Sequence, residues 1–128
     1  MLISEDGTVK LSVFDISTDL DNQNSKRQCT GCSSWDTAPE VAYESSCVMD
    51  DVWSLGISTI EMAEGRSPYA GYSLLGIKYQ VMYQPPPSLT SSGWSSYLVD
   101  FVGKCVEQCV NKRASVDRLL KVSPFEFM

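Results

Sequence analysis

The pattern of apolar and polar residues in the first third of the chain predicts a short hairpin followed by a long polar loop. Apolar residues in 1–4 and 9–14 flank the sequence Glu5-Asp6-Gly7-Thr8, and Asp-Gly is one of the strongest turn signals between two strands. Residues 17–37 are rich in Asp, Asn, Ser and Thr and carry almost no apolar pattern. Polar segments of this length usually lie on the surface and are functional or mobile. We therefore expect a β-hairpin over residues 1–14 and a surface loop over residues 17–37.

The most apolar segment, residues 52–65, predicts a central helix. Asp50 and Asp51 precede it and suit the positive end of a helix dipole, and Gly65 is a natural stop. Its apolar residues cover most of the helix circumference; they are Val52, Trp53, Leu55, Ile57, Ile60 and Met62. A helix that is apolar nearly all round belongs in the middle of a domain.

Three further helices are expected. Residues 73–83 form a weaker helical pattern, which Gln84 and three prolines end as an extended turn. After Ser95 or Ser96 as cap, apolar residues follow helical spacing again: Leu98, Phe101, Val102, Cys105, Val106 and Cys109. A last short helix is expected to start at Ser115 and to pack through Val116, Leu119 and Leu120. The pattern thus predicts one mainly helical domain with a small hairpin at its front.

Composition agrees with one globular domain. The chain has 128 residues, of which 43% are hydrophobic and 20% charged; this is enough for one core and too little for two. Its apolar runs are far shorter than the about 18 residues of a membrane span, and its start lacks the features of a signal peptide. A net charge of −6 argues against binding to nucleic acid or anionic lipid. We expect neither a nucleic-acid partner nor a membrane partner.

The numbers of cysteine and histidine residues limit the kinds of catalytic and metal site that the chain could hold. Five cysteines without a secretory signal predict free thiols in a reducing compartment, hence a cytoplasmic location. The chain has no histidine, which excludes Ser-His and Cys-His nucleophile pairs and zinc sites that need imidazole. Cys29 and Cys32 have the spacing of a redox pair or zinc knuckle, although no second CxxC completes a zinc site. Cys105 and Cys109 lie one helical turn apart and are expected to be core thiols.

Six motifs occur in an order and spacing that is typical of one family. They are DGTVKL (6–11), TAPEV (37–41), DDVWSLGISTIEMAEGRSPYAG (50–71), QPPPSL (84–89), DFVGKC (100–105) and NKRAS (111–115). The chain resembles the C-terminal lobe of eukaryotic protein kinases, and it is most similar to Ser/Thr kinases of the sterile-twenty or germinal-centre group. This resemblance implies a partial kinase domain over residues 1–128, from after the catalytic loop to the last helices. The expected fold is mainly α, with a front β-hairpin, an activation segment and about four helices.

The resemblance also implies structural roles for single residues. The matching kinase positions are Ala38, Pro39, Glu40, Asp51, Trp53, Gly56 and Arg113. Asp51 matches a buried carboxylate that accepts backbone N–H groups of the catalytic loop. Glu40 and Arg113 match a buried ion pair that ties the activation segment to the last helices. Trp53 and Trp94 are expected to be packing anchors.

The segment KLSVFDIST, Lys10–Thr18, decides the expected activity. The family carries VKL-x-DFG-x-S here, and the DFG Asp chelates the Mg²⁺ that bridges the ATP phosphates. An alignment without gaps places Val13, Phe14 and Asp15 on the Asp, Phe and Gly, whereas matching Asp15 to the Asp needs two inserted residues. Valine cannot bind Mg²⁺, which prefers oxygen ligands. We expect a degenerate DFG motif in which Asp15 is a turn residue.

The remaining catalytic parts of the family would all precede residue 1. They are the Gly-rich loop, the phosphate-contacting Lys and the HRD loop, and no other phosphate-binding fingerprint replaces them. The resemblance therefore implies ATP and Mg²⁺ for the family, with no catalytic, cofactor-binding or metal-binding residue in this chain. We expect a pseudokinase-like module that binds proteins such as a kinase, substrate or scaffold. The alternatives are the C-terminal part of an active Ser/Thr kinase with its ATP-binding lobe encoded elsewhere, and a small CxxC redox or metal module.

The loop before APE carries candidate phosphorylation sites, namely Thr30, Ser33, Ser34 and Thr37. Each phosphate would add about −2 charge and could order the loop. The chain departs from the family at Cys109-Val110, which stands where the family has a D/N-P turn and predicts a longer helix. The family also packs another long helix beside the central one. Without it, we expect an exposed apolar patch that promotes aggregation or needs a partner.

Overall fold

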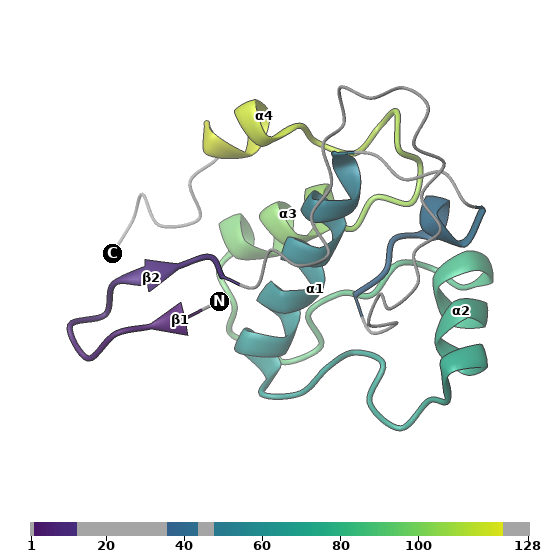
Figure 1. Cartoon of the computed structure of the whole chain (residues 1–128), viewed down its shortest axis with the longest axis horizontal. Coiled ribbons are helices and arrows are strands. Elements are labelled where there is room, and N and C mark those ends of the chain that lie inside the picture. Colours follow the sequence, from purple (N-terminus) through teal and green to yellow (C-terminus); the bar gives the residue numbers. More distant parts are fainter. Residues whose placement is uncertain (1, 13–35, 44–47, 122–128) are drawn as a thin grey trace.

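The computed structural model describes residues 2–12, 36–43 and 48–121 (Figure 1). These ranges contain a two-stranded sheet, a short 3₁₀ helix at Pro39–Tyr43 and four α-helices. The helices are α1 (Met49–Glu64), α2 (Leu74–Tyr83), α3 (Ser96–Cys105) and α4 (Val116–Leu120). The predicted mainly helical fold with a small hairpin is therefore confirmed. The predicted starts of α2, α3 and α4 are correct within one residue, whereas α1 begins three residues before the predicted segment 52–65.

The hairpin consists of β1 (Leu2–Ile3) and β2 (Val9–Lys10), which pair antiparallel with Leu2 opposite Lys10. Gly7 takes a positive φ of 83° in its turn, a conformation that favours glycine. Hydrogen bonds from the Ser4 hydroxyl and from Thr8 hold the Asp6 carboxylate and lower its pKa to about 2. The hairpin projects from the helices in Figure 1, and its apolar side chains Leu2, Ile3, Val9 and Leu11 are all exposed.

Helix α1 contacts α3 along its length and supplies the centre of the core. Trp53, Ile57 and Ile60 are buried there, together with Ile77 and Val81 of α2 and with Val102 and Val106. Gly56 allows this close approach, since a Cβ at this position would lie 2.7 Å from the Cβ of Cys105. The absence of a side chain at residue 56 is thus a packing requirement.

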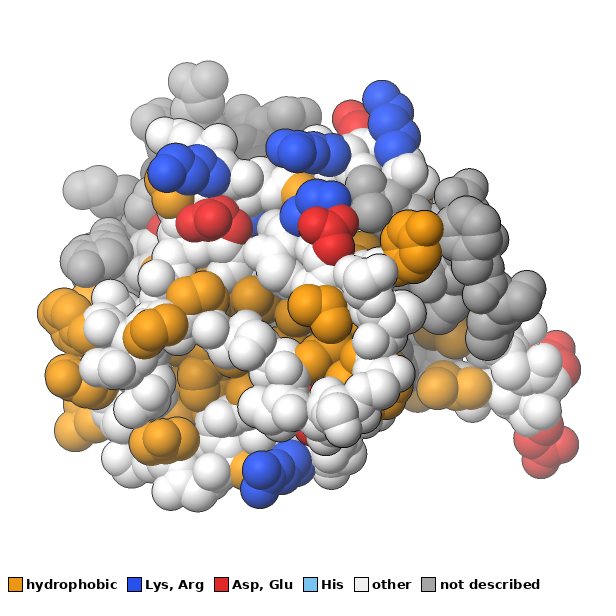
Figure 2. Space-filling view, turned by 180° about the vertical axis from the view of Figure 1, so that it is seen from behind, with side chains coloured by type: hydrophobic (Ala, Val, Ile, Leu, Met, Phe, Trp, Pro, Cys, Tyr) orange, Lys and Arg blue, Asp and Glu red, His pale blue; other side chains and the backbone are white. Residues whose placement is uncertain are grey.

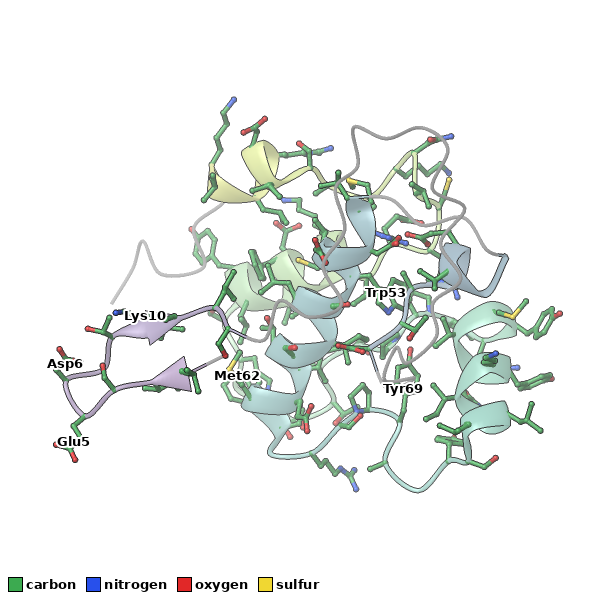
Figure 3. The ribbon with its side chains drawn as sticks, viewed as in Figure 1. Glu5, Asp6, Lys10, Trp53, Met62 and Tyr69 are labelled. Atoms are coloured by element: carbon green, nitrogen blue, oxygen red, sulfur yellow. The ribbon has the colours of Figure 1, made fainter. Side chains whose placement is uncertain are left out.

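The apolar residues of α1 are divided between two faces. Asp51, Leu55 and Met62 lie on one side of the helix, because steps of four and seven residues return to the same face. Leu55 is 41% exposed and Met62 is 64% exposed, and Met62 projects on the side where the hairpin lies (Figure 3). The prediction that α1 would be buried all round is wrong for this face.

The C-terminal part also differs from the sequence pattern. Helix α3 ends at Cys105, because the chain turns where the Cys109 carbonyl accepts the N–H groups of Lys112 and Arg113. The predicted extension to Cys109 is wrong. Cys105 is a core thiol whose pKa burial raises to about 11, whereas Cys109 is exposed. In α4 only Leu119 is buried, so the predicted packing of Val116 and Leu120 is also wrong.

Three of the four described helices begin with a serine cap, whereas α1 begins without a side-chain cap at Val48. The hydroxyls of Ser73, Ser95 and Ser115 accept the N–H groups of Gly76, Leu98 and Arg118 in the first turns of α2, α3 and α4. None of the helices in the described ranges is long and apolar enough to cross a membrane.

Candidate functional site around Glu40 and Arg113

The segment that carries Glu40 is held against the N-terminal half of α1. Ala38 is buried in the same cluster as Trp53, and its carbonyl accepts the N–H of Val41 in the first turn of the 3₁₀ helix. The Ser54 hydroxyl of α1 donates to the carbonyl of Asp36 at 2.9 Å. These contacts turn the side chain of Glu40 into the protein interior.

Glu40 meets Arg113 in a two-pronged ion pair. Nη2 of Arg113 donates to Oε2 of Glu40 at 2.9 Å, and Nη1 donates to Oε1. Glu40 is 9% exposed and Arg113 4% exposed. Residues 73 positions apart are thereby joined by the strongest kind of charge-assisted hydrogen bonding that protein side chains form.

Arg113 uses its remaining donors on backbone carbonyls. Nε donates to the Glu107 carbonyl at 2.8 Å, and Nη1 donates to the Met49 carbonyl at 2.8 Å. The guanidinium also lies 5.2 Å from the centre of the Trp53 ring, a distance typical of a cation–π contact. One side chain therefore fastens the 3₁₀ segment, the start of α1 and the α3–α4 connection to one another.

The charge of Glu40 is maintained by its partner. Burial by itself would raise the pKa of Glu40, but the hydrogen bonds from Arg113 hold that pKa below its ordinary value. Both side chains use their polar atoms within the protein, so the pair offers no group to a substrate. This is a junction that fixes loop geometry, and its chemistry is structural.

Asp51, which in the family accepts N–H groups of the catalytic loop, lies on the exposed face of α1. Its neighbour Val52 is buried on the opposite side. Asp51 shares this exposed face with Leu55 and Met62.

The degenerate DFG motif, most of the candidate phosphorylation sites and the CxxC pair lie outside the described residues. These are Val13, Phe14, Asp15, Thr30, Ser33, Ser34 and the pair Cys29 and Cys32. Thr37 is described and is partly buried. Within the described ranges no group of three His, Cys, Asp or Glu residues could hold a metal ion.

The structure contains two buried polar atoms without a partner in the described ranges, Nε1 of Trp53 and the hydroxyl of Tyr69. Both residues lie between α1 and α2 (Figure 3). Burial raises the pKa of Tyr69 to about 12. A packing role for Trp53 agrees with its complete burial, whereas Trp94 is 38% exposed.

Sequence patterns did not reveal the residues that fix the loop between α2 and α3. Gln108 donates to the carbonyls of Val81 and Gln84 at 3.0 and 2.7 Å, which satisfies the C-terminal end of α2. Glu64 holds the other end of this loop. These contacts join residues 24 to 30 positions apart, so no local sequence motif predicts them.

Comparison with known proteins places these features in a family. The model of the protein kinase domain matches residues 1–125. The chain is 36% identical over 125 residues to serine/threonine-protein kinase hippo of Drosophila melanogaster, covering 94% of this chain and 18% of that protein. It is 37% identical over 121 residues to the neither inactivation nor afterpotential protein C of the same organism, covering 88% of this chain and 8% of that protein. The chain thus spans less than a fifth of either relative, at 18% and 8% of their lengths. It belongs to the protein kinase domain family.

Proposed function

We propose that the chain is the C-terminal lobe of a Ser/Thr protein kinase domain of the sterile-twenty or germinal-centre group. The observation that carries this proposal is the buried pair of Glu40 and Arg113. It joins the APE motif to the NKRAS motif, as the resemblance to the kinase lobe implies. Such a pair is retained only with both partners, because a single buried charge is strongly unfavourable.

The chain alone is proposed to lack phosphoryl transfer. The gapless register puts Val13 on the metal-binding Asp of the family, and the 128 residues contain no HRD motif. Phosphoryl transfer depends on charged groups that position ATP and Mg²⁺. The proposed role is therefore binding to another protein, in the manner of a pseudokinase.

Exposed apolar side chains support a binding role. The outer face of α2 carries Leu75, Tyr79 and Tyr83, which are 80%, 54% and 64% exposed. Figure 2 shows apolar side chains gathered on the surface at the α2 side of the molecule. Leu55 and Met62 on α1 are exposed apolar side chains as well.

The proposal is tested by measuring the binding of ATP to the purified chain through thermal denaturation, with and without Mg²⁺. We expect no Mg²⁺-dependent rise of Tm at millimolar ATP, whereas an intact Ser/Thr kinase domain should show one, because ligands that bind only the folded state raise its stability. Magnesium-dependent stabilisation of the 128-residue chain would overturn the inactive assignment.

A second candidate function is the C-terminal part of an active Ser/Thr kinase. It is favoured by the small share of each relative that the chain covers, 18% and 8%. The test is phosphoryl transfer by the product of the complete gene, compared with its Val13→Asp variant. Transfer by the unsubstituted protein would favour this second function over the first.

A further inference from the structure

The carboxylate of Glu64, at the end of α1, holds the loop between α2 and α3. It accepts the backbone N–H groups of Thr90 at 2.9 Å and Ser91 at 3.0 Å. The hydroxyls of the same two residues donate to it at 3.2 and 2.5 Å. The indole N–H of Trp94 completes the set at 3.2 Å. We call this arrangement the Glu64 clamp.

The clamp depends on negative charge at one residue. The donors that it has among the described residues are all neutral. Hydrogen bonds, above all from the Ser91 hydroxyl, lower the pKa of Glu64 to about 2. At neutral pH the clamp is therefore an anion surrounded by hydroxyl, amide and indole donors, and a second anion at the same place would oppose it.

Ser91 is the donor at which such an anion can be introduced. Its side chain is exposed, so a modifying enzyme can reach it, and its hydroxyl makes the shortest contact of the clamp. We propose that Ser91 is a phosphorylation site and that its phosphorylation opens the Glu64 clamp. The phosphoryl donor is ATP, and the catalyst is a Ser/Thr protein kinase acting on this chain as its substrate.

The chemical step and its consequence follow from the geometry. The Ser91 oxygen forms a bond to the γ-phosphorus, the bond from that phosphorus to the bridging oxygen breaks, ADP leaves, and the hydroxyl proton passes to the base of the modifying kinase. The hydrogen bond that the Ser91 hydroxyl donated to Glu64 is lost. A group with about −1.5 to −2 charge replaces it beside the carboxylate. Repulsion then separates the loop from the end of α1, and Trp94 loses its partner.

The neighbouring residue Ser92 provides a matched control. It is exposed like Ser91 and lies in the same loop, but its side chain makes no hydrogen bond to Glu64. A phosphate on Ser92 adds the same charge without removing a donor from the clamp. Any effect of net charge alone is therefore shared by both positions.

The experiment compares full chains that carry genetically encoded phosphoserine at position 91 or at position 92. Trp35→Phe is included so that Trp94 is the exposed indole, since Trp53 is buried. Phosphate at 91 is expected to lower Tm and to increase acrylamide quenching of Trp94 fluorescence. Phosphate at 92 should leave both values near those of the unmodified chain. Equal responses at the two positions would overturn the proposal.

Two further measurements separate the clamp from a general loss of folding. In a Glu64→Gln background the phosphate at 91 no longer faces an anion, so its effect on Tm should be smaller; an unchanged effect would contradict the mechanism. Mass spectrometry of the protein recovered from cells should find phosphate on Ser91, and phosphate confined to other serines of the loop would overturn the site. Both outcomes are independent of whether the chain itself transfers phosphate.

Discussion

Two glutamates hold loops against α1, and they do so by different means. Glu40 is buried and pairs with the permanent positive charge of Arg113, whereas Glu64 lies at the surface and binds only neutral donors. The pKa of each is lowered, in Glu40 by Arg113 against the cost of burial and in Glu64 by hydrogen bonds from Ser91. The buried pair needs both partners to be tolerated. The surface clamp can be dismantled and formed again, which suits regulation.

The largest expected effect comes from removing one partner of the buried pair. Arg113→Met leaves the Glu40 carboxylate buried without a cation and removes the guanidinium donors from the carbonyls of Glu107 and Met49. We expect the free energy of unfolding to fall by about 3–5 kcal/mol, measured by urea denaturation followed by circular dichroism. The exposed Arg118→Met is the control and should change stability by less than about 0.5 kcal/mol. A loss of that small size in Arg113→Met would contradict the account of the pair.

Removing both charges sharpens the comparison. Glu40→Leu combined with Arg113→Met leaves no unpaired charge in the protein interior. The double variant should therefore be more stable than Arg113→Met alone, by about 2 kcal/mol or more. Recovery should be incomplete, because the part-buried Glu107 carbonyl still lacks its Nε donor, at a cost of up to about 1–3 kcal/mol. The same urea measurement tests this. A double variant as unstable as the single one would show that Arg113 acts through its backbone contacts and not through Glu40.

The surface clamp is tested through pH. The folded pKa of Glu64, about 2, lies below its ordinary value of 4.5. Its contribution to stability is therefore complete above pH 4.5 and is lost as pH falls toward 2. Glu64→Gln should be less stable than the unsubstituted chain at pH 7, by less than the loss in Arg113→Met, and the gap should close on acidification. Glu61→Gln, an exposed change in the same helix, is the control and should leave stability at pH 7 within about 0.5 kcal/mol of the unsubstituted chain.

The two glutamates also show what a sequence can and cannot predict here. The pair of Glu40 and Arg113 was expected because each lies in a family motif, although nothing local connects residues so far apart. Glu64 also lies in a family motif (50–71), but its donors Thr90, Ser91 and Trp94 are ordinary loop residues outside every motif. The existence of the Glu64 clamp depends on how the loop returns to the end of α1, which only the folded chain determines.

The predicted elements failed where a tertiary contact overrides the local pattern. The spacing of Cys105 and Cys109 continues the helical period of α3, yet the chain turns between them because Arg113 is drawn to Glu40 and to the Glu107 carbonyl. On α1 the pattern located the helix but could not tell which apolar face is covered. Met62 is as apolar as many core residues, so the sequence alone does not show that it is exposed. It is 64% exposed because no neighbouring element in the described ranges covers it.

The smallest expected effect concerns a buried polar group with no charge and no partner. The hydroxyl of Tyr69 is buried beside the core, without a hydrogen bond in the described ranges. Burying a hydroxyl without a partner costs about 1–3 kcal/mol, so Tyr69→Phe should leave stability unchanged or raise it by about 1 kcal/mol. Tyr79→Phe, at a side chain that is 54% exposed, should have no effect on the same urea curve. If Tyr69→Phe instead lowered stability by 1 kcal/mol or more, the hydroxyl would have a partner in solution, and the set of fastened polar groups in this core would extend beyond Glu40 and Arg113.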